Sequence, residues 1–249
     1  MAERAAAFSA FSSKHSQQGD KMTDMRSNEL PRIALIHTTP LVLPAVEGAI
    51  LSLKNKYDFF HTLDEALLYR IMKDGNSADL VVPWLQTLVD QAVKGDAQAV
   101  IVTCSSLSPY VQEVNEKSTV PVIRVDEMMY INVAKTTENP AVLMTNPSNE
   151  IPAALLAKET EEGLGLMKPI PINICPGAFD ALKAGDTDKH DQAVIREVDS
   201  MLQKHDAVMF SQISMARVRD LLAAEQQARV HVSLDYLEQI LGESLSSYR

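Results

Sequence analysis

Two segments of the chain place residues that could do chemistry in the same pattern, 108 positions apart. Residues 99–106 read AVIVTCSS and residues 207–214 read AVMFSQIS, so Cys104 of the first segment corresponds to Gln212 of the second. In both segments a short apolar run, typical of a buried strand, ends in small polar side chains. A thiol there can carry a proton or act as a nucleophile, whereas a glutamine amide can only donate and accept hydrogen bonds.

The same offset relates a second pair of segments. Residues 33–39 (IALIHTT) correspond to residues 141–147 (AVLMTNP), so His37 and Thr38 match Thr145 and Asn146. Two pairs of equivalent strand ends indicate a duplicated α/β half. In a duplicated fold the strand ends of both halves can face one cleft, which would set the thiol of one half opposite the amide of the other.

The elements that must position these residues alternate along the chain from residue 32 onward. The clearest helix is 77–95, where apolar residues recur at spacings of three and four between a Ser start and a Gly stop. Strands are predicted at 99–103, 121–125, 141–144, 170–174, 207–210 and 229–232, and further helices at 148–162 (closed by Gly163), 188–204, 214–224 and 234–241. Alternating β and α units predict parallel sheets, so the expected fold is α/β, with two pseudo-symmetric lobes and an active-site cleft between them.

The domain organisation follows from the same pattern. Residues 1–31 lack apolar periodicity and predict a disordered tail. The first lobe is expected at 32–139 and the second at 140–249, with a C-terminal helix that could pack back on the first lobe.

Composition excludes several classes of partner. The net charge of −10 and a pI near 5.1, with no basic run, argue against a nucleic-acid partner. No apolar run approaches the ~20 residues that a bilayer span needs. The two cysteines lack zinc-ligand spacing, which predicts no metal and a reducing, cytoplasmic compartment. No glycine-rich phosphate loop occurs, so no nucleotide cofactor is expected.

In parallel sheets ligands bind beyond the carboxyl ends of the strands. This rule selects a set of candidate site residues: Thr38, Thr39, Cys104, Ser105, Thr145, Asn146, Ser211 and Gln212. Ser106 joins them as part of the cluster of small polar side chains at 103–106. Each hydroxyl also has a simpler explanation as a helix N-cap, above all Ser214. Cysteine is often only a packing residue, as we expect for Cys175. The environment of Cys104 differs, because the start of a helix favours both a thiolate and a bound carboxylate.

Two histidines are further candidates. His37 ends a strand, and His61 follows Phe59 and Phe60. Either could move a proton at neutral pH. The competing interpretation, slightly favoured for both, is a half-buried histidine with one satisfied nitrogen.

These residues resemble the aspartate/glutamate racemase superfamily, which includes hydantoin racemases, maleate isomerases and arylmalonate decarboxylase. The likeness rests on the duplicated halves, on VTCSS at 102–106 and on VDEM at 125–128, and it spans residues 32–248. It implies a site between the halves, in which one cysteine from each half acts on opposite faces of a carbon next to a carboxylate. It also implies a small carboxylic-acid substrate, cofactor-independent chemistry and a homodimer or higher homo-oligomer.

Carried over residue by residue, the resemblance makes Cys104 the first catalytic cysteine. Ser105 and Ser106 stand where carboxylate-binding residues follow it, and Thr38 and Thr39 occupy the first strand-end loop. Thr145 and Asn146 are the counterparts of that loop, and Glu127 matches an acid common after the fourth strand.

The departure lies at the second cysteine, where this chain has Gln212. Racemisation needs an acid on one face and a base on the other, and glutamine does not titrate. His37, His61 or Glu127 could supply the second acid or base, which keeps an isomerase of the racemase type as the expectation. One thiol suffices for a decarboxylase or lyase, with Gln212 binding a carboxylate or the developing enolate. The third alternative is a non-catalytic protein that binds small carboxylates.

Overall fold

The computed structural model describes residues 30–246. The predicted tail at 1–31 therefore lies, apart from its last two residues, outside the described part of the chain. The described residues form an α/β fold of two four-stranded parallel sheets, as the sequence predicts. The first sheet has the order β2-β1-β3-β4, built from β1 (Arg32–His37), β2 (Asp58–Leu63), β3 (Ala99–Val102) and β4 (Val122–Arg124). The second has the order β6-β5-β7-β8, built from β5 (Pro140–Met144), β6 (Ile172–Ile174), β7 (Ala207–Phe210) and β8 (Val230–Val232).

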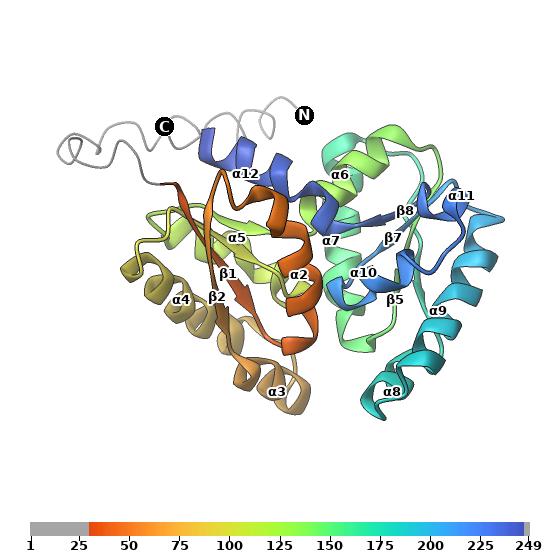
Figure 1. The fold of residues 1–249 in the computed structure, drawn as a ribbon, viewed down its shortest axis with the longest axis horizontal. Helices are drawn as coiled ribbons and strands as arrows, with labels where there is room; N and C mark the ends of the chain where they lie inside the picture. Colours follow the sequence, from red (N-terminus) through yellow and green to blue (C-terminus); the bar gives the residue numbers. More distant parts are fainter. Residues whose placement is uncertain (1–29, 247–249) are drawn as a thin grey trace.

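The helices stand around the two sheets, which lie side by side as two lobes (Figure 1). Those of the first half are α2 (Leu43–Ile50), α3 (Glu65–Asp74), α4 (Ala78–Lys94), α5 (Ser108–Lys117) and α6 (Glu127–Thr136). Those of the second half are α7 (Glu150–Leu164), α8 (Ala178–Lys183), α9 (Thr187–Leu202), α10 (Ala216–Arg219), α11 (Ala224–Gln227) and α12 (Leu237–Ser246). Short 3-10 helices complete the chain: η1 (Pro40–Val42), η2 (Leu51–Leu53), η3 (Ser105–Leu107), η4 (Pro147–Asn149), η5 (Ile213–Met215) and η6 (Ser233–Tyr236).

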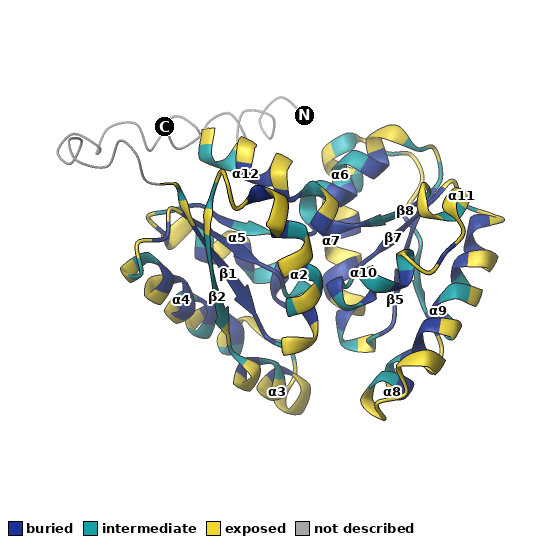
Figure 2. Cartoon of the chain, in the orientation of Figure 1, coloured by how far each residue is buried: buried dark blue, intermediate teal, exposed yellow. Residues whose placement is uncertain are grey.

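The 108-residue repeat is visible in the secondary structure. The offset carries β3 onto β7, β4 onto β8 and η3 onto η5 without a shift, and the two sheets have equivalent strand orders. The central strands β1, β3, β5 and β7 are buried along almost their whole length, so their sequences are continuous apolar runs. Figure 2 shows the dark-blue strands beneath helices whose outer faces are yellow.

The last helix of each half packs against the sheet of the other half. Met129 and Val133 of α6 share a core cluster with Val142 and Met209 of the second sheet. In return, Ile240 and other apolar residues of α12 share a cluster with β1 and β3. This exchange joins the lobes through buried apolar surface on both sides, and therefore holds their strand ends in a fixed relation.

The structure corrects three sequence-based expectations. The predicted helix at 214–224 is wrong, since η5 and α10 end at Arg219 and α11 is separate. Gly163 lies inside α7, and the helix ends instead at Gly165, whose φ of 66° is readily adopted only by glycine. Strand β2 was not anticipated, because an edge strand with a half-buried pattern lacks a continuous apolar run.

Candidate functional site

The strand-end turns of the two halves meet at the junction of the lobes. Turn η3, which follows Cys104, packs against η4. Turn η1 packs against η5, and the repeat relates η5 to η3 and η4 to η1. These two contacts are related by the repeat. They bring the residues around Cys104 next to those around Thr145 and Asn146, while Thr39 begins η1 and Gln212 begins η5.

Cys104 lies in a cradle of hydrogen-bond donors. The residue is the N-cap of η3, which runs directly into α5, and its side chain is half-buried against the core of the first lobe. The buried Thr38 hydroxyl, which has no hydrogen-bond partner within residues 30–246, the hydroxyl and N–H of Ser106, and the N–H of Leu107, which also donates to the Cys104 carbonyl, act to lower the pKa of this thiol. Such donors stabilise a thiolate or a bound carboxylate.

Burial outweighs these donors in the free protein. Desolvation raises the pKa of the Cys104 thiol, and the donors around it lower the pKa by less, so the net shift is upward. The thiolate expected from the helix start is therefore not the resting form. At neutral pH Cys104 is a thiol with a proton to give, and the donors become effective when charge develops beside them.

This balance predicts how Cys104 reacts with iodoacetamide. We expect its alkylation, followed by peptide mass spectrometry, to rise at a higher pH than that of an ordinary exposed thiol. Thr38→Val removes one donor and is expected to slow alkylation at alkaline pH by about threefold or more. Thr39→Val is the matched control, because the Thr39 hydroxyl accepts from the Leu41 N–H instead. An ordinary or lower alkylation midpoint, or equal effects of the two variants, would contradict the described environment.

Gln212 is held in a single orientation by the neighbouring strand end of its own lobe, beyond β5. Its Oε1 accepts from the Thr145 N–H (2.8 Å), the Thr145 hydroxyl (3.1 Å) and the Asn146 N–H (3.1 Å). Two of these partners are backbone N–H groups, which only donate, so the atom they contact must be the oxygen. The Nε2 group of Gln212 consequently points away from Thr145 and Asn146, and none of residues 30–246 accepts a hydrogen bond from it.

His37 and His61 form a chain of hydrogen bonds on the opposite face of the first sheet from Cys104. His37 Nδ1 lies 2.7 Å from Thr103 Oγ1, and His37 Nε2 lies 2.9 Å from His61 Nδ1. His61 Nε2 lies 2.9 Å from Glu47 Oε1, whose second oxygen accepts from Lys54. The two rings stack with centroids 5.1 Å apart.

The protons of this chain can be counted. Thr103 donates its hydroxyl hydrogen to Ile36 O (2.9 Å) and therefore accepts from His37 Nδ1–H. Neutral His37 then presents Nε2 as an acceptor to His61 Nδ1, while His61 Nε2 faces the Glu47 carboxylate. Burial, and secondly the His61 charge, lower the pKa of His37 to about 4, which agrees with a neutral ring. The expected half-buried histidine with one satisfied nitrogen is wrong for both: His37 is fully buried, and both rings use both nitrogens.

Glu127 is also engaged elsewhere. Its carboxylate accepts from Arg124 at 3.0 and 3.3 Å, and Arg124 donates to Glu159 of α7 at 2.6 Å. This ion pair links β4 and α6 to the second half of the chain. None of His37, His61 and Glu127 therefore presents an unoccupied acid or base in the described structure.

Some of the remaining predicted residues lie at the junction of the lobes, and the others make structural contacts within a lobe. Ser105 is half-exposed in η3, and Asn146 caps η4 by accepting from the Ser148 N–H while its own N–H binds Gln212. Ser211 accepts from Asn149 Nδ2 (3.0 Å), which ties β7 to η4. Ser214 is not the expected N-cap, since it lies inside η5. Cys175 is buried in the second-lobe core, and burial raises its pKa to about 11.

Sequence reasoning missed the residues that hold these groups in place. Glu47, Asn149 and Asn76, whose Nδ2 donates to Ser106 O, all lie in helices, turns or loops rather than at strand ends. No strand-end rule selects them, because their roles depend on partners many positions away in the sequence.

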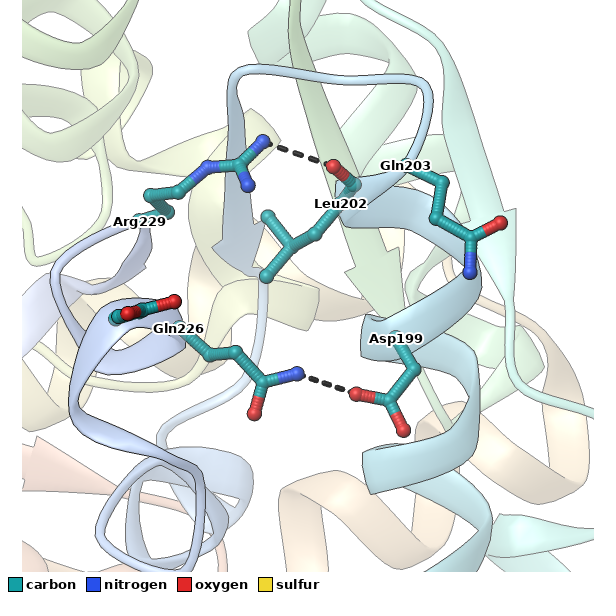
Figure 3. Close-up of a pocket in the computed structure, with 6 residues that line it drawn as sticks. Asp199, Leu202, Gln203, Gln226 and Arg229 are labelled. Atoms are coloured by element: carbon teal, nitrogen blue, oxygen red, sulfur yellow. Dashed lines mark hydrogen bonds between the residues drawn. The ribbon is translucent and has the colours of Figure 1, made fainter.

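A hollow of about 540 Å³ on the second lobe lies among Asp199, Leu202, Gln203, Glu225, Gln226 and Arg229 (Figure 3). Arg229 donates to the carbonyl oxygens of Leu202 and His205, so its guanidinium stabilises the C-terminal end of α9. None of the strand-end candidates lines this hollow.

Residues 30–246 contain no group of three or more His, Cys, Asp or Glu side chains placed to hold a metal ion. No helix in this range is long and apolar enough to cross a membrane.

The geometry defines a two-lobed α/β protein with a thiol and a fixed amide at equivalent strand ends. The family model described as Asp/Glu/Hydantoin racemase matches residues 41–234, and the chain belongs to this family. The family was anticipated from the strand-end motifs, and the match confirms it. Membership supports a racemase-like function and suggests isomerase activity.

Solved structures agree on the fold. Glutamate racemase isoform RacE1 from Bacillus anthracis has a TM-score of 0.67 at 15% identity, over 87% of this chain and 83% of that chain. Picrophilus torridus aspartate racemase has a TM-score of 0.66 at 11% identity, over 88% and 99%. Allantoin racemase from Klebsiella pneumoniae has a TM-score of 0.60 at 14% identity, over 87% and 88%. Among curated proteins no sequence matches the chain.

Proposed function

We propose that this protein catalyses cofactor-independent proton transfer at the carbon next to a carboxylate of a small acid, with Cys104 as the one proton carrier. The observation that carries the proposal is the asymmetry of the repeat. Cys104 lies in a cradle of donors, whereas its counterpart Gln212 cannot titrate and is fixed by three hydrogen bonds. The substrate carboxylate or enolate would be bound by the donors of η3 and by Thr38, and Gln212 Nε2 would donate to another oxygen of the substrate.

A single carrier restricts the stereochemistry. A proton that leaves one face and returns from the same sulfur restores the same configuration. The family suggests an isomerase, and a one-carrier isomerase would move a proton along one face of an enolate. Full racemisation would need a second group, and His37, His61 and Glu127 each have their polar atoms bonded elsewhere.

A second candidate is a decarboxylase, and the protonated resting state of Cys104 favours it. Loss of CO2 from an acid with a neutral carbonyl group at the β-position, such as a malonate half-amide, breaks the C–C bond and leaves its electron pair on the α-carbon as an enolate. The Cys104 thiol can then give its proton to that carbon, and the thiolate is reprotonated from water. The donors around Cys104 would stabilise the thiolate formed in this step.

Deuterium incorporation tests the proposal. The full-length protein is incubated in D2O with both enantiomers of a panel of 2-substituted carboxylates, and with prochiral malonates, and products are followed by proton NMR and chiral chromatography. We expect deuterium in one enantiomer only. Gln212→Cys should add exchange of the other enantiomer, because a second thiol would then stand on the mirrored side. Gln203→Cys, which adds a thiol at an exposed residue, is the matched control and should not.

Other outcomes decide between the candidates. Equal turnover of both enantiomers by the unmodified protein, with deuterium in each, would contradict the single carrier and favour a racemase. Binding of carboxylates without exchange or decarboxylation across the panel would favour a non-catalytic carboxylate-binding protein.

A further inference from the structure

The edge of the second lobe contains an anion-binding nest that is already occupied. Two successive backbone N–H groups, of Thr145 and Asn146, and the Thr145 hydroxyl converge on one point beyond the end of β5. Consecutive N–H groups of this kind bind carboxylate and phosphate oxygens. Here the point is filled by Gln212 Oε1, an oxygen of the chain itself.

The two halves of the site consequently offer different surfaces to a ligand. In the first half the donors of Thr38, Ser106 and Leu107 surround the Cys104 thiol, which is uncharged in its resting form. In the second half the donors of Thr145 and Asn146 bind Gln212 Oε1, and Gln212 Nε2 has no acceptor among residues 30–246. An NH2 group suits a neutral carbonyl oxygen, and it offers no counter-charge for an anion.

A second substrate carboxylate placed beside Gln212 would find too few donors or cations to offset its desolvation. Desolvating a carboxylate is expensive unless it gains a cation or several donors. Within residues 30–246 no Lys or Arg bonds to Gln212, Thr145 or Asn146, and the nest cannot help unless Oε1 leaves and gives up three hydrogen bonds.

We infer that Gln212 determines substrate specificity, by filling the anion nest of the second lobe so that the site accepts acids with one carboxylate and a neutral carbonyl group and rejects dicarboxylates. This inference rests on the proposed function for the position of the site. It narrows the substrate class to monocarboxylates that carry an amide, ureide, ester or ketone oxygen at the far end. Aspartate-like and glutamate-like dicarboxylates fall outside that class.

Paired probes of equal length test the inference by isothermal titration calorimetry on the full-length protein. Succinate carries two carboxylates, and succinamate replaces one of them by an amide. We expect the unmodified protein to bind succinamate about tenfold more tightly than succinate, since a charge left without partners is penalised by that order. In Gln212→Ala the nest is open, and succinate should become the tighter ligand because a charged acceptor makes stronger hydrogen bonds to the same donors.

Gln212→Glu is the matched control. A carboxylate oxygen of the glutamate can refill the nest without opening space, so this variant should still reject succinate. Equal affinities of the unmodified protein for the two probes, or binding of neither, would overturn the inference. So would an unchanged preference in a folded Gln212→Ala variant; if that variant does not fold, the probe ratios of the unmodified and Gln212→Glu proteins decide.

The experiment separates this inference from the proposed function. Binding requires no proton transfer, so the same ratios are measured in Cys104→Ala. A preference for succinamate without any deuterium exchange by the unmodified protein would remove the proposed function and keep Gln212 as the specificity residue. Deuterium exchange without a preference for succinamate over succinate would keep the proposed function and remove Gln212 as the specificity residue.

Discussion

Replacing Cys104 by Ala or Ser is expected to abolish deuterium exchange while leaving the fold intact. Removing a positioned proton carrier lowers the rate by about 10²–10⁴-fold, and we expect the upper part of that range because His37, His61 and Glu127 are bonded elsewhere within residues 30–246. Serine keeps the hydrogen bonds to the η3 donors, but its hydroxyl ionises far less readily than a thiol. The measurement is the exchange rate by NMR, with thermal unfolding as the check on folding.

Cys175→Ala is the control for that experiment. Cys175 is 2% exposed and packs in the second-lobe core, so its truncation should cost about 1 kcal/mol of stability and leave the exchange rate unchanged. An inactive Cys175 variant together with an active Cys104 variant would show that the site has been assigned to the wrong thiol.

Two buried groups are expected to give opposite dependences of stability on pH. Asp126 is 4% exposed, and its carboxylate accepts from the Ser108 hydroxyl, at 3.0 and 3.1 Å. Burial raises the pKa of Asp126 to about 6. The folded state then binds a proton more tightly than the unfolded chain, so stability is present below pH 4 and declines as pH rises towards 6.

His37 acts in the other direction. Burial, and then the charge of His61, lower its pKa from 6.5 to about 4. The unfolded chain therefore takes up the proton first as pH falls, so the stability due to His37 is present above pH 6.5 and declines towards pH 4. Each shift corresponds to about 3 kcal/mol at its full extent, so the two effects largely cancel in the unmodified protein.

Urea unfolding of Asp126→Asn and His37→Gln between about pH 4.5 and 8 separates the two effects, because all other titrations cancel in differences from the unmodified protein. Asp126→Asn should gain stability relative to the unmodified protein as pH rises, by up to about 3 kcal/mol. His37→Gln should show the opposite trend over the same interval. Difference curves that stay flat with pH would show that neither group has a shifted pKa.

The sequence by itself determined the repeat and the chemistry of the strand ends. Central strands are covered on both faces, so β1, β3, β5 and β7 are apolar runs whose ends stand out in the sequence, and the thiol of Cys104 and the amide of Gln212 occupy equivalent ends. The edge strand β2 is only half-buried, and its pattern therefore gave no comparable signal. The residue type alone likewise shows that position 212 has no titratable side chain.

The protonation, charge and orientation of those groups are set by tertiary contacts. The protonation of Cys104 depends on burial by residues from several elements. The partners of His61 are Glu47 and His37, which lie 14 and 24 positions away along the chain. The orientation of the Gln212 amide depends on donors 66 and 67 positions away. Hydrogen bonds and desolvation act through space at distances of a few ångströms, so a local sequence pattern can supply the chemical groups but not the partners that set their charge and direction.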